Sequence, residues 1–494
     1  MAESIAGKVE CQETLMATVR PEAAAVAPPL LTDEAISQLR RAVKGDVLQP
    51  GQPGFEAEKD GFERAVVHHP ALVVAARGHE DVAAAVQWAA EQGLGVAVQA
   101  TGHGPGAPAD ASAILVTTSR MTSVDIDTKA RTARVDAGAR WSDVIEAAAR
   151  HGLVPLSGAA PAVSAVGYLL GGGLGLLSRR FGSPADQIHS LSVVTADGRT
   201  VEASLAAHPE LFWGLRGSRG NFGVVTSATI GLFPLDLFAG GSLFFDGEHL
   251  RAVLDAWTAW TATVPDAMCS SLAVLRFPPL PQVPEFLRGR HAVHVRIAFT
   301  GSEEEARSLL APLTSAAPLL ADTTAAMPYS RSGAIHADST NPAATVSRTM
   351  LLGELDEAAV DTLERLGERD DAGPLLFELR HLQGALAHPV ENGGAVGARP
   401  DAVFSLFSLA VLVPGVDGAE VVARHFQSDV EKALTPWAVP GAEPNFVVGP
   451  RTEEQVREVY GTRTYRKLSA LKTRYDPANM FRYNLNIRPE TQIH

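Results

Sequence analysis

The sequence predicts an α+β protein whose two domains differ in the character of their strands. The 494 residues are more than a single hydrophobic core usually holds. From Pro70 to Pro234, short apolar runs alternate with helical and glycine-rich segments. Beyond residue 238, longer alternating strands are separated by amphipathic helices, which indicates an antiparallel sheet with helices on one face. We expect a flexible tail at 1–32, a first domain at 33–238 completed by 455–494, and a second domain at 239–454.

The elements of the first part follow from local patterns. A helix begins after Thr32, which is a suitable N-cap, and carries an apolar stripe. An Asp197-Gly198 turn between two apolar runs predicts a hairpin. In chain order we expect helix 32–44, strand 71–75, helix 80–92, strands 95–98 and 113–117, hairpin 124–126/132–135, helix 141–151, hairpin 191–195/200–203 and strand 224–230.

The second part is predicted by the same periodicities. Alternating apolar and polar residues indicate half-buried strands, and apolar residues three and four apart indicate helices. The expected strands are 241–245, 271–277, 292–299, 375–382 and 402–412. The expected helices are 250–264, 303–311 and 356–366, followed by a helical segment at 452–474.

Composition restricts the class of protein and its partners. Hydrophobic residues make up 46% and charged residues 20%, as in globular proteins. A net charge of −14 argues against binding to nucleic acid or an anionic membrane. Cys11 and Cys269 are too few for a disulfide framework or a thiolate metal site. With no visible signal peptide or membrane span, we expect a cytoplasmic monomer or homodimer that acts on a small molecule.

One glycine-rich loop organises the first part. The apolar run 94–98 predicts a buried strand, and Thr101-Gly102-His103-Gly104-Pro105-Gly106 follows it directly. Glycine lets such a loop turn sharply and approach a ligand closely. We interpret the loop as a phosphate cradle with a reactive imidazole, His103, beside it.

Two further glycine-rich segments follow. Gly171, Gly172, Gly173 and Gly175 interrupt an apolar helical pattern, although glycine costs about 1 kcal/mol in a helix interior. We expect close backbone approach to a ligand, with tight packing of two elements as the alternative. The second segment, 211–223, ends in Gly220-Asn221-Phe222-Gly223 before the strand 224–230.

Several common chemistries lack their motifs. No Gly-x-Gly-x-x-Gly opens a helix after a strand, no P-loop lysine is present, and Gly-x-Ser-x-Gly is absent. His291 and His294 lie three apart on an expected strand, so they face opposite ways and cannot share a metal ion. We read His68-His69 as a solvated or hinge pair, and we expect no metal site.

The remaining motifs, in this order, resemble those of the FAD-linked oxidases of the vanillyl-alcohol-oxidase superfamily, and most closely the berberine-bridge-enzyme-like branch. The matching stretches are 101–104, 166–175, 212–217, 220–226 and 475–489, with a weaker match at 378–386. They cover well under half of the chain. The resemblance implies a two-lobed PCMH-type FAD-binding domain and a substrate domain, with the flavin ring at their junction.

The resemblance also implies the cofactor contacts. His103 would be joined through a ring nitrogen to the flavin 8α-carbon, by addition of a neutral imidazole; a histidine that only hydrogen-bonds in a turn is the alternative. The residues expected to bind FAD are Thr101, Gly102, His103, Gly104, Gly106, Ala160, Gly167, Gly171, Gly172, Gly173, Gly175, Gly220, Asn221, Gly223, Val224, Val225, Asn484 and Asn486.

Two positions depart from the family pattern. Many relatives carry a cysteine that forms a second flavin bond where this chain has Ala160, so we expect a single covalent link. Relatives often have a catalytic tyrosine where this chain has Glu443, in Glu443-Pro444-Asn445-Phe446. A buried carboxylate with a raised pKa suits the role of base, and an exposed acid in a changed loop is the alternative. The other candidates are Tyr465, His381, His336 and Tyr329, with packing favoured for Tyr465.

The function that we expect is flavin-dependent oxidation. A C–H next to a hydroxyl or amine of a bulky molecule, in a secondary-metabolite tailoring role, would give hydride to flavin N5, and O2 would reoxidise the flavin. An FAD-containing cyclase or isomerase without net redox turnover, and a binding protein with a degenerate flavin site, are the alternatives. We expect the sheet side chains Phe377, Leu379, His381, Phe404 and Phe407 to face the substrate; a sheet–helix core is the alternative.

Overall fold

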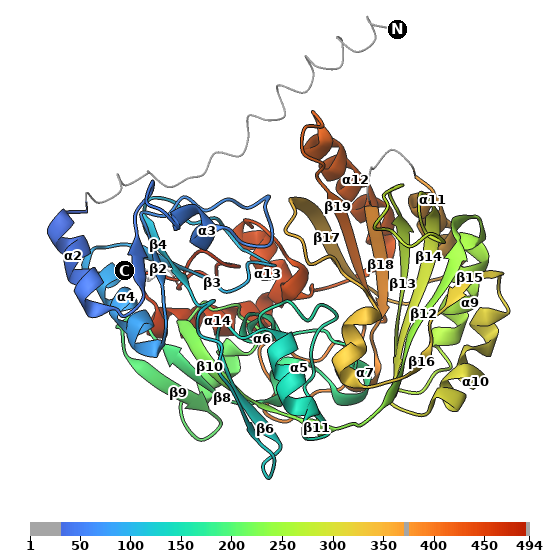
Figure 1. Ribbon diagram of the computed structural model, residues 1–494, viewed down its shortest axis with the longest axis horizontal. Coiled ribbons are helices and arrows are strands. Elements are labelled where there is room, and N and C mark those ends of the chain that lie inside the picture. The colour runs from blue at the N-terminus through green and yellow to red at the C-terminus, as the bar shows by residue number, and fades with distance from the viewer. Residues whose placement is uncertain (1–30, 370–374, 491–494) are drawn as a thin grey trace, which may run out of the picture. The chain divides into compact units, whose positions relative to one another are not determined.

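A four-stranded sheet forms the N-terminal part of the structure, a computed structural model that describes residues 31–369 and 375–490. Its strand order is β1-β2-β4-β3, with β2, β4 and β3 parallel (Figure 1). Strands β2 and β4 are buried along their whole length because helices and the C-terminal segment cover both faces. The elements are α2 (Asp33–Ala42), β1 (Asp46–Leu48), α3 (Phe55–Lys59), β2 (Leu72–Ala75), α4 (His79–Glu91), β3 (Gly95–Gln99) and β4 (Ala113–Thr117).

A second, antiparallel sheet follows with the order β5-β6-β10-β8-β9. Trp141 on α5 and Phe222 are fully buried in its core. The small pair β7–β11 completes this part. Its elements are β5 (Val124–Asp127), β6 (Thr132–Asp136), α5 (Trp141–Ala149), β7 (Leu153–Val154), α6 (Ala165–Leu170), α7 (Ser178–Phe181), η2 (Pro184–Gln187), β8 (Ile188–Val194), β9 (Thr200–Ser204), α8 (Pro209–Leu215), β10 (Val224–Gly231) and β11 (Phe233–Pro234).

The largest sheet has nine strands, in the order β15-β12-β14-β13-β18-β19-β17-β20 with β16 also paired to β12. Its strands are β12 (Phe238–Asp246), β13 (Met268–Arg276), β14 (His291–Phe299), β15 (Leu319–Asp322), β16 (Ala325–Met327), β17 (Thr345–Leu352), β18 (Leu375–His381), β19 (Phe404–Val411) and β20 (Ala438–Val439). The intervening helices are η3 (Gly247–His249), α9 (Leu250–Thr261), α10 (Glu303–Thr314), η4 (Tyr329–Ala334), α11 (Glu357–Gly367), η5 (Gly384–Ala387), α12 (Ala419–Leu434), η6 (Thr435–Trp437) and η7 (Pro444–Phe446). Helices α9 to α12 share one core with one face of the sheet.

The side chains of β18 and β19 divide between the two faces of this sheet. Phe377, Leu379 and Phe404 lie in the core beneath the helices, so our prediction that they face the substrate is wrong. Phe404 and Phe407 are three positions apart on one strand, and strand side chains alternate, so the two rings point to opposite faces. Phe407 is the member of the predicted set on the open face, where it lines a cavity.

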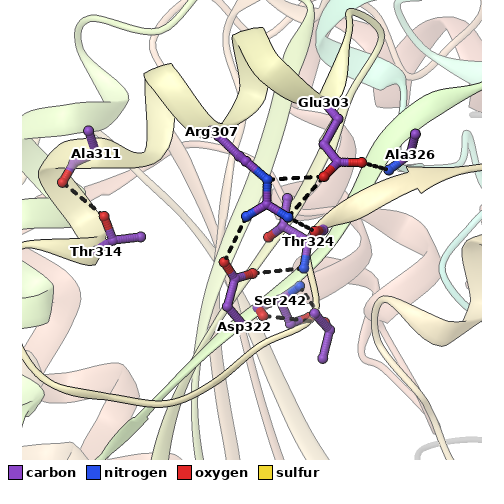
Figure 2. Close-up of polar contacts among 9 residues, drawn as sticks. Ser242, Glu303, Arg307, Ala311, Thr314, Asp322, Thr324 and Ala326 are labelled. Carbon is purple, nitrogen blue, oxygen red and sulfur yellow. Dashed lines mark hydrogen bonds and ion pairs between the residues drawn. The ribbon is translucent and has the colours of Figure 1, made fainter.

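An arginine on α10 holds the edge strands β15 and β16 in place (Figure 2). Arg307 bonds to Glu303 on its own helix and to the carbonyl of Thr324 at 2.9 Å. Glu303 in turn accepts the backbone N–H of Ala326, and Asp322 lies 3.4 Å from the guanidinium. Each contact is partly exposed and contributes little alone, but together they anchor the sheet edge to a helix.

The C-terminal segment returns to the first two sheets. Residues 452–474, expected as one helical segment, form α13 (Glu453–Tyr460) and α14 (Thr462–Tyr475), separated by Gly461 with φ 73°. Phe481 then packs in the core of the first sheet and Ile487 in that of the second. The domain bounds themselves stay a prediction.

His68 and His69, which we interpret as a solvated or hinge pair, differ in their exposure to solvent. His68 is buried, and its Nδ1 accepts the backbone N–H of Ala109, whereas His69 is exposed. The expectation that His68 is solvated is therefore wrong. Over residues 31–369 and 375–490, the chain contains no helix long and apolar enough to span a membrane. Cys11 lies outside the described residues.

Candidate active site

A cavity of about 390 Å³ lies between the glycine-rich loop and the open face of the nine-stranded sheet. One wall consists of the loop 101–106 with Ser164 and Tyr168 from the segment around α6. The opposite wall is formed by Arg380 and Phe407, on β18 and β19, and by Phe446. The cavity therefore unites segments that are distant in sequence.

The loop 101–106 is held by close backbone contacts. Gly102 has φ +67°, and a Cβ there would lie 2.5 Å from Gly61. A Cβ on Gly106 would lie 2.4 Å from the Cα of Asn484. These two glycines are thus required by packing against protein, while the loop still lines the cavity.

His103 projects from this loop with a defined orientation. Its ring stacks on Phe62, with centroids 3.9 Å apart and planes at 10°. Its Nδ1 lies 2.9 Å from the hydroxyl of Thr101, which also accepts the N–H of Ser164. Burial and the nearby Arg140 lower the pKa of His103 to about 4, against the opposing charge of Asp338. The imidazole is therefore neutral at neutral pH, the form that acts as a nucleophile.

The run of glycines at 171–175 packs against protein, which supports the packing alternative. A Cβ on Gly173 would lie 2.5 Å from the ring of Tyr168, and one on Gly171 would lie 1.9 Å from Oδ1 of Asn445. A Cβ on Gly172 would lie 2.5 Å from the side chain of Val396, and one on Gly175 would lie 2.2 Å from the carbonyl oxygen of Ser157. None of these four glycines lines the cavity, so our prediction that they contact the cofactor does not agree with the structure.

The other predicted cofactor residues divide into two groups. Asn221 bonds to the carbonyls of Ser218 and Leu485 and accepts the N–H of Ile487, so its side chain is used for structure. Asn486 likewise does not line the cavity. The predicted residues that do line it are Thr101, Gly102, His103, Gly104, Gly106, Ala160, Gly167, Gly220, Gly223, Val224, Val225 and Asn484.

The three predicted catalytic residues do not line this cavity. Glu443 is buried, with a carboxylate oxygen 3.2 Å from Nε of Arg399. Burial raises the pKa of Glu443, and Arg399 and Arg380 oppose that shift. The hydroxyl of Tyr465 accepts the N–H of Arg488 within the core, which agrees with the packing role favoured for it. A cavity-facing role for these two side chains does not fit the structure.

The remaining candidate bases lie deeper. His381 contacts Arg179 at 2.8 Å, and burial together with Arg179 lowers its pKa to about 3. Tyr329 bonds to Ser157, and burial raises its pKa to about 12. His336 lies 3.3 Å from the carboxylate of Glu378. His381 and His336 line a second, smaller cavity of about 40 Å³.

Sequence reasoning missed several residues of the main cavity. Arg219 donates to the carbonyls of Gly104, Pro444 and Val447, and so ties the loop of His103 to the opposite wall. Its φ of +56° is unusual for a side chain of this size. The position of Arg219 between two glycines, Gly217-Ser218-Arg219-Gly220, is the only local signal that marked it.

The residues present fit a flavin dinucleotide. Oδ1 of Asn484 is buried without a hydrogen-bond partner at the cavity wall. Val98 is 45% exposed although it lies on a strand of the first sheet, and it faces the same cavity. An apolar wall, an unpartnered polar atom and a glycine loop are the features of a large cofactor site.

Two family models match the chain in agreement with this geometry. The FAD binding domain model matches residues 70–204, and the berberine and berberine like model matches residues 445–488. Both matched segments contribute to the cavity walls. The protein is therefore an FAD-linked oxidoreductase.

Comparison with relatives that match over nearly the whole chain shows which enzymes the protein is similar to. The chain is 27% identical to (R)-6-hydroxynicotine oxidase of Paenarthrobacter nicotinovorans, over 91% of this chain and 98% of that protein. The crystal structure of 6-hydroxy-D-nicotine oxidase from Arthrobacter nicotinovorans has a TM-score of 0.76 at 25% identity, covering 91% of this chain and 98% of that chain. A chitooligosaccharide oxidase has a TM-score of 0.79 at 19% identity, covering 92% and 100%, and so shares the fold. The chain thus carries FAD-binding and berberine-like domains, and its relatives of nearly full length are FAD-linked oxidases and oxidoreductases.

Proposed function

We propose that this protein oxidises a bulky small molecule, of the secondary-metabolite type, at a C–H bond next to a hydroxyl or amine, with O2 as the final electron acceptor. The observation that carries the proposal is the neutral His103 at one wall of a cavity whose opposite wall is the aromatic and polar face of a sheet. When bound there, FAD supplies a two-electron acceptor that O2 reoxidises.

We also propose that His103 anchors the cofactor. A ring nitrogen of His103 would form the bond to the flavin 8α-carbon, and the bound flavin, reoxidised by O2, would supply the electron acceptor for that bond formation. The stacked Phe62 ring orients the imidazole, and its low pKa keeps the nitrogen lone pair free. Ala160 lines the cavity at the position where the family resemblance implies a second anchor, and alanine cannot form one, so we expect a single link.

The shape of the cavity supports a bulky, partly apolar substrate. Phe407 and Phe446 lie with ring centroids 4.9 Å apart on the wall opposite the loop. Polar groups from Ser347 and Arg380 lie beside these rings. Such a combination of flat apolar surface and few polar groups orients a substrate in one pose.

The test is anaerobic reduction of the purified holoenzyme. A panel of secondary alcohols, sugars and cyclic amines is added under argon, and bleaching of the flavin absorption band is followed. At least one class is expected to bleach the band, and oxygen uptake is expected to match product formation one to one. A panel that leaves the band unchanged contradicts the proposal.

The alternative function is cyclisation or isomerisation without net redox turnover. The specific observation in its favour is the placement of Glu443, which is paired with Arg399 and does not reach the cavity as a base would. Product formation without oxygen uptake would support this alternative over the oxidase.

A further inference from the structure

Two rows of side chains cross the open face of the nine-stranded sheet. The strand register places Ala273 between His294 and Glu378 in one row, and Ser271 between Arg296 and Arg380 in the next. Residues paired across adjacent strands point to the same face. The charged side chains of β14 and β18 therefore meet on the face that lines the cavities.

Glu378 is the centre of this cluster, and both of its oxygens are occupied. Oε1 accepts Ser271 at 2.8 Å and Arg296 at 2.6 Å, and lies 3.3 Å from His336. Oε2 accepts Nε of Arg380 at 2.8 Å. Burial opposes ionisation, but Arg380 and Arg296 hold the pKa of Glu378 well below its usual range. The carboxylate is thus ionised and saturated.

The cluster carries more positive than negative charge. Arg296 and Arg380 face the single carboxylate of Glu378, while burial and Arg296 lower the pKa of His336 and leave it neutral. Asp338, which is exposed on the larger cavity, and Glu443, which is paired with Arg399, act on Arg380 at longer range, and neither forms an ion pair with it among the described residues. An excess positive charge in a sheltered site favours an anion.

Buried polar atoms without hydrogen-bond partners lie at the smaller cavity, next to Glu378. Nε of Arg296 and Nδ1 of His336 are buried without hydrogen-bond partners, and both side chains line the smaller cavity. The two residues are only 3% and 8% exposed. Buried polar groups in folded proteins are almost always satisfied, so these atoms indicate a ligand or its hydration shell.

Arg380 lies between the two cavities. It lines both of them, together with Ala159 and Leu174. Its Nε is bound to Glu378, and its terminal N–H groups form no hydrogen bond with the described residues. Its guanidinium lies 4.9 Å from the ring centroid of Phe446. A fixed, planar cation beside a flat aromatic wall is the arrangement that recognises carboxylates and phenolates.

We propose that Arg380 binds an anionic oxygen of the substrate, a carboxylate or an ionised phenol or enol, carried on a planar ring that lies along Phe407 and Phe446. This deepens and rests on the proposed oxidase function, since it names the substrate class of the same cavity. Glu378 positions Arg380, and the inner cavity with His336 and Arg296 holds the remainder of the acidic group and its water.

The test is isothermal titration calorimetry of the holoenzyme with benzoate, 4-nitrophenolate and the neutral benzamide. At least one anion is expected to bind about tenfold or more tightly than benzamide, and the tighter anion identifies the acidic group. Arg380→Met is expected to abolish this preference. Arg290→Met, which removes an equal charge from an exposed position next to β14, is expected to retain it.

The outcomes separate this proposal from the oxidase function, because binding is measured without turnover. Equal affinities for benzoate, 4-nitrophenolate and benzamide overturn it, as does a preference that survives in Arg380→Met. If Arg380→Met does not fold, Arg380→Gln keeps a donor for Glu378 but lacks the charge, and is expected to lose the preference in the same way. Anion preference in an enzyme whose flavin is never bleached leaves this inference standing while the oxidase function fails.

Discussion

The imidazole of His103 lies parallel to the phenyl ring of Phe62, with centroids 3.9 Å apart and planes at 10°. Phe62 belongs to a loop before the first parallel strand, and the N–H of Phe62 donates to the carbonyl of Thr101. The proposed anchor is thus oriented by a residue far earlier in the chain.

Replacing Phe62 with alanine is expected to slow covalent flavin attachment by about tenfold, because the ring that orients His103 is removed. Attachment is measured as flavin fluorescence that remains with the denatured protein after mixing apoprotein and FAD. Phe62→Tyr keeps the stacked ring and serves as the control. His103→Ala is expected to bind FAD without any covalent link; if it retains one, His103 is not the anchor.

The pH dependence of attachment follows from the lowered pKa of His103. With a folded pKa of about 4 instead of 6.5, the imidazole stays neutral from pH 8 down to pH 5 and becomes protonated only near pH 4. Attachment rates are therefore expected to be level between pH 8 and 5. In Phe62→Ala, greater exposure raises the pKa of His103, and the rate should fall between about pH 7 and 6. A wild-type rate that already halves near pH 6.5 contradicts this expectation.

A second anchor is expected from Ala160→Cys. Ala160 lines the cavity, and the family resemblance implies a flavin-linked residue at this position. In the His103→Ala background, Ala160→Cys should restore flavin that resists denaturation, and peptide mass spectrometry should locate it at residue 160. Cys269, a wild-type thiol that lines the smaller cavity and not the main one, provides the internal control because it should remain unmodified.

Glu443→Gln tests whether the paired carboxylate is a base. Because Glu443 pairs with Arg399 and does not line the cavity, we expect kcat to change by less than about threefold. Stability should fall by about 1–3 kcal/mol, since the mostly buried guanidinium of Arg399 loses its charged partner and keeps only the carbonyl of Ala442 among the described residues. Steady-state kinetics and urea unfolding provide the two readouts. A hundredfold loss of kcat with an altered pH profile would instead establish Glu443 as the base.

Comparing Gly173→Ala with Gly418→Ala separates the two costs of replacing a glycine, the overpacking and the strain of a left-handed backbone. Gly173 has φ +81°, and a Cβ there would lie 2.5 Å from the Tyr168 ring, whereas Gly418 has φ +78° with nothing within 4 Å. Gly418→Ala is expected to cost about 1–2 kcal/mol for the left-handed backbone alone. Gly173→Ala should cost a further 1–3 kcal/mol or so from overpacking. Equal losses in urea unfolding would show that the Tyr168 contact is unimportant.

Lys472 and Asp476 form a fully buried pair, with Nζ 2.7 Å from Oδ2, that joins α14 to the carbonyls of Asn221 and Phe481. Lys472→Met leaves an unpaired buried carboxylate and is expected to cost about 3–5 kcal/mol in urea unfolding. FAD affinity should fall as well, because both connected segments adjoin the cavity. Lys432→Met, at an exposed position on α12, should change stability by less than about 0.5 kcal/mol.

Much of the secondary structure could be predicted because its signals are local. The strand 113–117 agrees with β4 at both ends, and the helix at 356–366 differs from α11 by one residue at each end. The break at Gly461 was missed because apolar spacing continues on both sides of it. The faces of β18 and β19 were misassigned because alternation defines two faces without saying which one the helices cover.

The sequence by itself determined the glycine loop with His103, the order of the glycine-rich motifs, and the presence of alanine at position 160, because these depend on residue type and spacing along the chain. Tertiary structure decided which glycines line the cavity and which pack against Tyr168 and Asn445. It also paired Glu443 with Arg399 and brought Arg380 to the cavity wall. Burial and charge pairing arise between segments distant in sequence, so only the folded chain establishes them.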